Sequence, residues 1–255
     1  MKTQMIVTLC LGAMTMFAQT AIDLMTAETF SVPETGTLPY RQYVTPGLPK
    51  DGKVPLILFL HGIGERGSDN AAQLKHGVAE LIAFAGANGG AVIIAPQCPE
   101  NDMWVTGIEP KDPTHVMPAE PSPPMKLTLA LVNEKIEKMP VDPDRVYVTG
   151  LSMGGYGTWD IILRRPKLFA AALPICGAGD PTLASVIKGI PVMIAHGSAD
   201  SVIPVARAHD MAAALKACGG NVQYREYEGV DHDSWTQTYA DRDILKWMFD
   251  QRRQK

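Results

Sequence analysis

Short runs of hydrophobic residues alternate along the chain with longer stretches in which apolar positions recur at helical spacing. The clearest runs are residues 54–60 (VPLILFL) and 91–95 (AVIIA), and such runs are typical of parallel strands buried on both faces. Weaker runs and a turn signal near residue 34 predict further strands. These are two strands within 26–45 and single strands over 145–149, 170–175, 190–195 and 222–227.

Amphipathic spacing predicts the helices that connect these strands. Their ranges are 71–85, 127–139, 154–164, 204–218 and 234–251. The proline-rich stretch 101–124 has no period, and we expect an irregular loop there, the one place with room for a small cap. Buried strands that alternate with helices predict the α/β class, with a mostly parallel central sheet and helices on both faces.

The first residues predict a secretory signal peptide, residues 1–18. Lys2 is the only charged residue before Asp23, and a short apolar stretch lies between them. We expect cleavage after Ala18, a single mature domain over residues 19–255 and a secreted or periplasmic protein. The alternative is an uncleaved anchor. Because the apolar stretch is short for a membrane span, no stable membrane insertion is expected.

Composition narrows the classes of partner. The chain has 255 residues, of which 46% are hydrophobic and 20% are charged, as suits one domain with a full core. The formal net charge is −4, so the sequence lacks the excess of basic residues that is typical of proteins that bind nucleic acid. Three cysteines lie outside the predicted signal peptide: Cys98, Cys176 and Cys218. Their spacing is not that of a metal site, and the sequence does not show whether two of them form a disulfide. We expect no metal and no cofactor, and the oligomeric state is left open.

The segment GLSMG at positions 150–154 follows a predicted strand and opens a predicted helix. A Gly-x-Ser-x-Gly pattern in this context is typical of a nucleophile elbow, in which a tight turn lifts the serine above the sheet. The flanking glycines allow the turn to close, and the helix N-terminus favours developing negative charge. Ser152 is therefore the candidate nucleophile, and the alternative is a glycine-rich turn with a capping serine.

A serine hydroxyl needs a base and an orienting acid, which follow it in the order Ser, acid, His in the α/β-hydrolase fold. Asp200 follows the strand over 190–195, and His232 follows the strand over 222–227. Both therefore lie at carboxyl ends of strands, as Ser152 does. We expect His232 to accept the proton of Ser152 and Asp200 to fix the imidazole tautomer.

Several other side chains compete for these roles. Asp180 follows the preceding strand and is the alternative acid. The remaining candidates are expected to have local or structural roles: Asp231 and Asp233 as loop ligands, Asp144 at the wrong end of a strand, His61 and His196 as loop-shaping hydrogen-bonding residues, and His76, His115 and His209 on the surface or in loops.

An oxyanion hole needs two backbone donors. One is expected to be the N–H of Met153, the residue after the nucleophile, and the other comes from the loop after the strand over 54–60. Ile63 is the preferred second donor, with Gly62 or Gly64 as alternatives. In the same loop, Glu65 and Arg66 are interpreted as a charged pair, either a positioning device or a plain salt bridge.

The chain resembles the secreted bacterial α/β hydrolases known as predicted peptidases or poly(3-hydroxybutyrate) depolymerase-like esterases, whose relatives include feruloyl and acetyl esterases. The segments that carry the resemblance are FLHGIGERGSDN (59–70), APQCPENDMW (95–104), VTGLSMGGYGTWD (148–160), HGSADSVIPV (196–205) and DHDSW (231–235). The resemblance implies the triad Ser152, Asp200 and His232, and an esterase rather than a protease. The chain lacks the large extra domain of true oligopeptidases.

Two tryptophans are candidates for substrate binding. Trp104 lies in the irregular loop and Trp235 closely follows His232, so both are expected near the mouth of the site, where aromatic faces suit a ring or a sugar. The alternative is that either packs a loop against the core. The leading hypothesis is a serine ester hydrolase acting on small or polysaccharide-linked feruloyl or acetyl esters. The alternatives are a serine peptidase of the prolyl-oligopeptidase-like type and a non-catalytic carbohydrate-binding protein.

Overall fold

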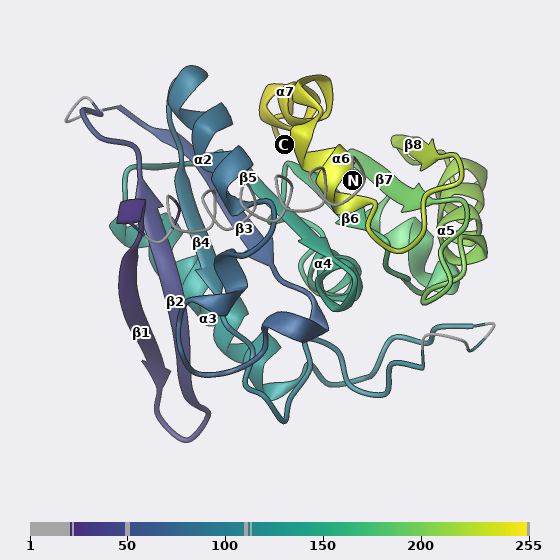
Figure 1. Ribbon diagram of the computed structural model, residues 1–255, viewed down its shortest axis with the longest axis horizontal. Helices are drawn as coiled ribbons and strands as arrows, with labels where there is room; N and C mark the ends of the chain where they lie inside the picture. The colour runs from purple at the N-terminus through teal and green to yellow at the C-terminus, as the bar shows by residue number, and fades with distance from the viewer. Residues whose placement is uncertain (1–20, 22, 49–51, 110–111, 113, 254–255) are drawn as a thin grey trace, which may run out of the picture.

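An eight-stranded sheet organises the protein (Figure 1). The computed structural model describes residues 21, 23–48, 52–109, 112 and 114–253, and the predicted signal peptide lies outside the described residues. The strand order is β1-β2-β4-β3-β5-β6-β7-β8. The bounds are β1 (Thr26–Val32), β2 (Gly36–Val44), β3 (Val54–Leu60), β4 (Val92–Pro96), β5 (Val141–Leu151), β6 (Ala171–Ile175), β7 (Val192–Gly197) and β8 (Val222–Tyr227).

The sheet is mostly parallel. All pairs from β4 through β3, β5, β6 and β7 to β8 are parallel. β1 and β2 form an antiparallel hairpin that pairs with β4 in the antiparallel sense. Every residue of β3 and β4 is buried, as the continuous apolar runs predict. Because these six strands run in the same direction, the six loops that follow them leave the same carboxyl edge of the sheet.

Helices cover both faces of the sheet. One hydrophobic cluster contains residues of α3 (Pro123–Lys138), α4 (Met153–Arg164) and α5 (Ala206–Ala217). The other contains residues of α2 (Val78–Ala87), α6 (Trp235–Ala240) and α7 (Arg242–Asp250). The predicted α/β architecture is confirmed. Within the described part of the chain, no helix combines the length and the apolar character that a membrane crossing requires.

The predicted helix over 71–85 is wrong in its first half. A short 3-10 helix, η2 (Ala72–Leu74), is followed by a break, and α2 begins only at Val78. Gly77, in the break, has a φ of 75°, and a Cβ at this position would lie 2.4 Å from the ring of Tyr239. The break therefore needs a residue without a side chain, because the left-handed backbone lies directly against α6.

The predicted helix over 234–251 is two helices, α6 and α7. Asp241 separates them with an extended backbone, and its carboxylate accepts hydrogen bonds from the N–H groups of Asp243 and Ile244. A side chain that caps the next helix in this way also ends the preceding one. The sequence pattern missed this because the apolar spacing continues across the break.

The irregular loop is shorter than predicted. Helix α3 begins at Pro123, and the Ser122 side chain accepts a hydrogen bond from the Met125 N–H (3.2 Å). Prolines in the first helical turn cost no hydrogen bond, so Pro123 and Pro124 start this helix where they were interpreted as loop residues. A further 3-10 helix, η3 (Pro181–Ile187), was not predicted.

Candidate active site

Ser152 occupies a tight turn between β5 and α4. Its backbone has φ 54° and ψ −118°. Residues other than glycine rarely adopt this conformation, because it is strained. A Cβ at position 150 would lie 2.4 Å from the Gly154 carbonyl oxygen, and a Cβ at position 154 would lie 1.9 Å from that of Leu60. Both glycines are therefore required by close backbone approach, and the turn has the geometry of a nucleophile elbow.

The structure brings Ser152, His232 and Asp200 together in one chain of hydrogen bonds. The Ser152 hydroxyl lies 2.8 Å from Nε2 of His232, and Nδ1 of His232 lies 2.8 Å from Oδ2 of Asp200. The three residues come from the ends of β5, β7 and β8. In Figure 1 the loop that joins β8 to α6, drawn in yellow, bends back toward α4. Nδ1 donates to the carboxylate, which leaves Nε2 free to accept the serine proton.

Asp200 is held in its ionised form by several donors. Its Oδ1 accepts hydrogen bonds from the N–H groups of Val202 (2.9 Å) and Ile203 (2.8 Å). Its Oδ2 lies 3.1 Å from Nε2 of His196, in addition to His232. Burial alone raises the pKa of Asp200, but the hydrogen bonds from His196, His232 and Ile203 outweigh it and hold the pKa well below its usual range.

The alternative acids are occupied elsewhere. Asp180 caps η3 by accepting from the N–H of Thr182 (3.0 Å), and it also accepts from the N–H of Met117 (3.0 Å). Asp231 accepts from the N–H of Ser201 (2.7 Å) and of His232 (2.8 Å), so it ties the Asp200 loop to the His232 loop. Asp233 accepts from the N–H of Thr236 (3.1 Å), as the loop-ligand interpretation expects.

The loop after β3 lies against the elbow. It carries η1 (Ile63–Glu65), and a Cβ at Gly62 would lie 2.9 Å from the Leu151 side chain. Ile63 and Met153 are the first residues of η1 and α4, so neither N–H has a partner inside its helix. These are the two donors that the sequence predicts for an oxyanion hole. The Ile63 side chain is 49% exposed, at the surface of the site.

His61 shapes this loop. Its Nδ1 donates to the Gly62 carbonyl (2.6 Å), and its Nε2 accepts from the N–H of Cys98 (2.9 Å). Burial lowers the pKa of His61 to about 4, so the ring is neutral at neutral pH and can make both bonds at once. His61 therefore has the structural role that the sequence indicates.

The prediction for Trp104 is wrong. Its side chain is completely buried, and Nε1 donates to the carbonyl oxygen of His61 (3.0 Å). A Cβ at Gly157 would lie 2.9 Å from that of Trp104, so the indole is packed between the oxyanion loop and α4. The ring supports the loop from beneath and offers no face to a substrate.

Trp235 lies beside the imidazole, as predicted. Its ring is half-buried and meets the His232 ring edge-on, with centroids 5.5 Å apart. On its other side it packs against His76, also at 5.5 Å. Nε2 of His76 lies 3.7 Å from the buried Glu65 carboxylate. Glu65 thus lies beside His76, while Arg66 donates to the carbonyl oxygens of Ile63 and Asp102.

Sequence reasoning missed two features of the surroundings. The loop before α3 crosses α4, where the His115 ring packs edge-on against Tyr156 with centroids 5.1 Å apart. Cys176, interpreted as a core residue, directly follows β6 and has a φ of 39°. Its thiol lies next to Asp200 and His232. Its place after a strand, like that of Ser152 and Asp200, was the available signal.

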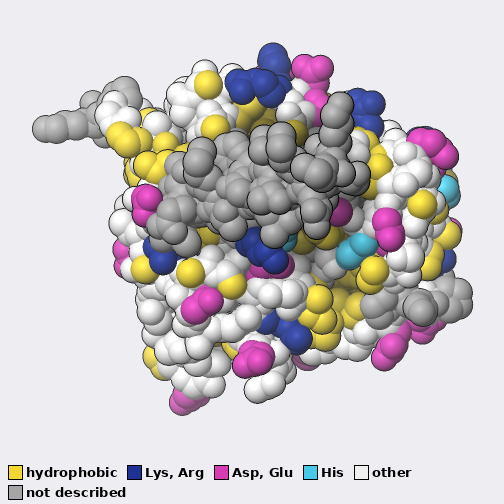
Figure 2. Space-filling view, in the orientation of Figure 1, with side chains coloured by type: hydrophobic (Ala, Val, Ile, Leu, Met, Phe, Trp, Pro, Cys, Tyr) yellow, Lys and Arg dark blue, Asp and Glu magenta, His cyan; other side chains and the backbone are white. Residues whose placement is uncertain are grey.

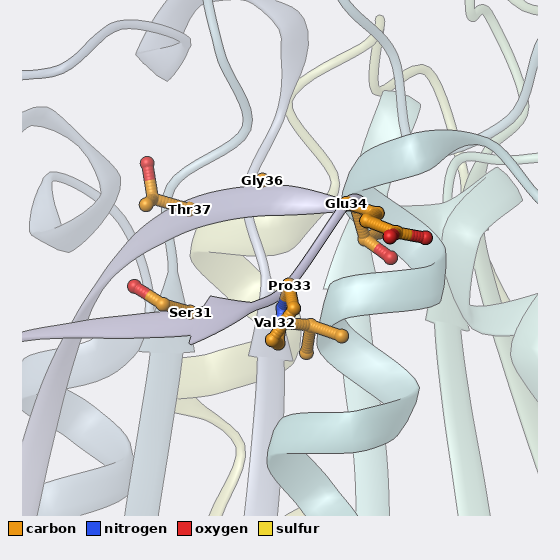
Figure 3. A pocket seen from close by; sticks show the side chains of 7 residues that line it. Ser31, Val32, Pro33, Glu34, Gly36 and Thr37 are labelled. Atoms are coloured by element: carbon orange, nitrogen blue, oxygen red, sulfur yellow. The ribbon is translucent and has the colours of Figure 1, made fainter.

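One face of the molecule is mixed in character. On the face shown in Figure 2, acidic and basic side chains are interspersed and hydrophobic side chains lie among them. A separate hollow is formed by residues 31–37 at the turn between β1 and β2 (Figure 3). That turn lies at the opposite edge of the sheet from β7 and β8. This hollow is therefore separate from the serine site.

Comparisons with known proteins agree with this geometry. The family described as phospholipase/carboxylesterase matches residues 48–243. A protein named as an esterase, NocK of Nocardia uniformis subsp. tsuyamanensis, is 31% identical over 172 residues, which are 66% of this chain and 46% of NocK. The poly(3-hydroxybutyrate) depolymerase of Ralstonia pickettii is 29% identical over 159 residues, which are 60% of this chain and 30% of that enzyme.

A solved structure described as a thermostable esterase shares the fold closely. It superimposes with a TM-score of 0.84 at 39% identity, covering 91% of this chain and 64% of that one. The likeness confirms the α/β-hydrolase fold that the elbow motif predicts. The chain spans less than two thirds of the length of each of these three relatives.

Proposed function

The chain belongs to the phospholipase/carboxylesterase family, and from this premise we propose that it is a serine carboxylic ester hydrolase that works through an acyl-enzyme. The observation that carries the proposal is the continuous chain of two 2.8 Å contacts from Ser152 through His232 to Asp200. A strained elbow and a buried, ionised aspartate complete the arrangement that activates a serine.

In the first half-reaction, Oγ of Ser152 attacks the ester carbonyl carbon while its proton passes to Nε2 of His232. The imidazolium that forms is stabilised by the Asp200 carboxylate. The C–O bond to the alcohol then breaks, and Nε2 returns the proton to the departing alkoxide. In the second half-reaction, water attacks the acyl carbon in the same way and releases the carboxylic acid and free Ser152.

The N–H groups of Met153 and Ile63 are proposed to bind the oxygen that becomes negative in each tetrahedral intermediate. Such donors act because they already point at the position where charge develops. His61 and Trp104 contribute indirectly, since both hold the loop that carries Ile63.

As substrates we propose feruloyl, acetyl or similar esters of plant polysaccharides. The support is the aromatic ring of Trp235 next to His232, together with the exposed Ile63 side chain on the oxyanion loop. An aromatic and apolar rim suits a flat acyl group. Consistent with an extracellular polymer, we propose that residues 1–18 direct the protein to the periplasm or out of the cell.

The test compares the purified protein with Ser152→Ala on p-nitrophenyl acetate and methyl ferulate. We expect Ser152→Ala to lose about 10⁶-fold in kcat, while Ser31→Ala, on the distant hairpin, keeps full activity. A fluorophosphonate probe should label the unmodified protein and not Ser152→Ala. Full activity in Ser152→Ala would refute the proposal.

The alternatives give different results in the same assays. A peptidase would cleave peptidyl substrates faster than esters, and a non-catalytic carbohydrate-binding protein would fail to react with the probe although folded. The substrate class is tested with acetyl, butyryl and feruloyl esters, free and linked to polysaccharide. A preference for free butyryl esters would contradict the polysaccharide proposal and leave the ester hydrolase intact.

A further inference from the structure

Cys176 brings a third kind of ligand to the serine site. Its sulfur, a carboxylate oxygen of Asp200 and a ring nitrogen of His232 all lie within 4.8 Å of one another. No other group of at least three His, Cys, Asp or Glu side chains with this spacing is found within the described residues. Cys176 is buried and forms no disulfide, so its sulfur is a free thiol at this site.

A second observation points to the same place. The hydroxyl of Ser234 is completely buried. This hydroxyl lies close enough to the Cys176 thiol to influence its pKa. A buried hydroxyl oxygen beside the Cys176 sulfur adds a further possible ligand to this part of the site.

The mixture of donors selects the class of ligand. Thiolate, imidazole and carboxylate together suit Zn²⁺ or Cd²⁺, whereas Mg²⁺ and Ca²⁺ prefer oxygen alone. Zn²⁺ binds sulfur at about 2.3 Å and nitrogen at about 2.0 Å, so its ligands must be about 3.5 Å apart. The side chains present must therefore move by about 1 Å. His232 lies on a loop and is 18% exposed, so it is the group that can move.

We propose that Cys176, Asp200 and His232 form a binding site for a thiophilic divalent cation such as Zn²⁺, and that the bound cation reversibly inhibits the enzyme. The binding stands on the ligand geometry alone, while the inhibition rests on the proposed function. Burial raises the pKa of the Cys176 thiol, so the thiol is protonated before the cation arrives. Binding forms a metal–sulfur bond and releases that proton to solvent.

The bound metal would inhibit the enzyme through either ring nitrogen of His232. At Nε2 the metal occupies the lone pair that accepts the serine proton. At Nδ1 it displaces the proton that faces Asp200, and the neutral ring then carries its proton on Nε2. In both cases Nε2 cannot accept a proton from Ser152, so acylation stops without any damage to the fold.

The binding is measured without catalysis. Zn²⁺ is titrated by calorimetry into folded Ser152→Ala, which keeps all three ligands, and into Ser152→Ala/Cys176→Ala. We expect one bound Zn²⁺ in the first protein and an affinity weaker by more than about 100-fold in the second, because loss of even an outer-shell partner costs up to that factor. Equal affinities would overturn the proposal, whether or not the protein hydrolyses esters.

The inhibition is measured with p-nitrophenyl acetate as the substrate, for the unmodified protein and for Cys176→Ala. Zn²⁺ and Cd²⁺ should inhibit the former at concentrations at least about 100-fold lower, and chelation should restore its activity. Mg²⁺ should have no effect, and Cys218→Ser should respond like the unmodified protein. Inhibition by Zn²⁺ that is identical in Cys176→Ala would place the metal elsewhere and refute the site. If Cys176→Ala does not fold, Cys176→Ser replaces it with the same expectation.

Discussion

Two histidines contact the same carboxylate oxygen, and only one of them reaches the serine. Nε2 of His196 lies 3.1 Å from Oδ2 of Asp200 and Nδ1 of His232 lies 2.8 Å from it. His196 lies within β7, one residue before its end, and has no exposed surface, whereas His232 lies in a loop and is partly exposed. Contact with the acid therefore does not define the base. What defines it is a second nitrogen that faces the nucleophile.

The two rings also differ in what their other atoms do. Nε2 of His196 lies 2.9 Å from the Ile203 carbonyl oxygen, so its proton is shared between that oxygen and Asp200. Nδ1 of His196 is buried with no partner among the described residues. His196 thus serves as a fixed donor that helps to keep Asp200 ionised, whereas His232 has a nitrogen that faces Ser152, as the proposed proton transfer requires.

The largest expected effect separates these two rings directly. His232→Gln should lower kcat on p-nitrophenyl acetate by about 10⁶-fold, because among the described residues His232 is the side chain that hydrogen-bonds to the Ser152 hydroxyl. Folded His196→Gln should lose no more than about 10-fold, because Asp200 keeps its other donors. Comparable losses in the two variants would show that His196 takes part in proton transfer.

Asp200→Asn is expected to lower kcat by about 10⁴-fold, because the amide no longer favours the Nδ1–H tautomer of His232. Asp231→Asn is the matched control, since Asp231 contacts the same two loops through the Ser201 and His232 N–H groups. We expect the control to lose less than about 10-fold. A smaller loss in Asp200→Asn than in the control would mean that the carboxylate only ties the loops together.

The sequence predicted the triad because each member directly follows a strand, and parallel strands end at one edge of a sheet. It could not predict side-chain direction within a loop. Trp104 and Trp235 have similar positions relative to their strands, yet one supports the oxyanion loop from below and the other lies beside the base. Likewise, the sequence could not predict that Glu65 lies beside His76, because His76 stands in the unpredicted break between η2 and α2.

A third histidine extends the comparison to stability. His61 is buried like His196, and its pKa falls from 6.5 to about 4 on burial. Between these values the unfolded chain binds a proton that the folded protein does not, so stability falls as the pH drops from 6.5 to 4. The loss is about 3 kcal/mol.

Urea unfolding at several pH values measures this loss. His61→Gln should be less stable at pH 7, and its stability should fall less steeply over the same interval, because the group that titrates is absent. Stability curves of the protein and the variant that stay parallel from neutral pH to pH 4 would show that folding does not lower the pKa of His61.

The smallest expected effect concerns the ring that holds His232 in place. An edge-on aromatic contact is worth about 0.5–1.5 kcal/mol, so Trp235→Leu should lower kcat/KM on p-nitrophenyl acetate by up to about 10-fold. Trp235→Phe keeps an aromatic edge and should recover most of this loss.

If Trp235 also stacks on the acyl group, Trp235→Leu should raise the KM for methyl ferulate more than that for the acetyl ester. Trp104→Phe should instead lower the unfolding free energy and leave KM unchanged. Equal effects of Leu and Phe at position 235 would mean that the aromatic edge beside His232 does not position it, which would leave that role to Asp200 and Asp231.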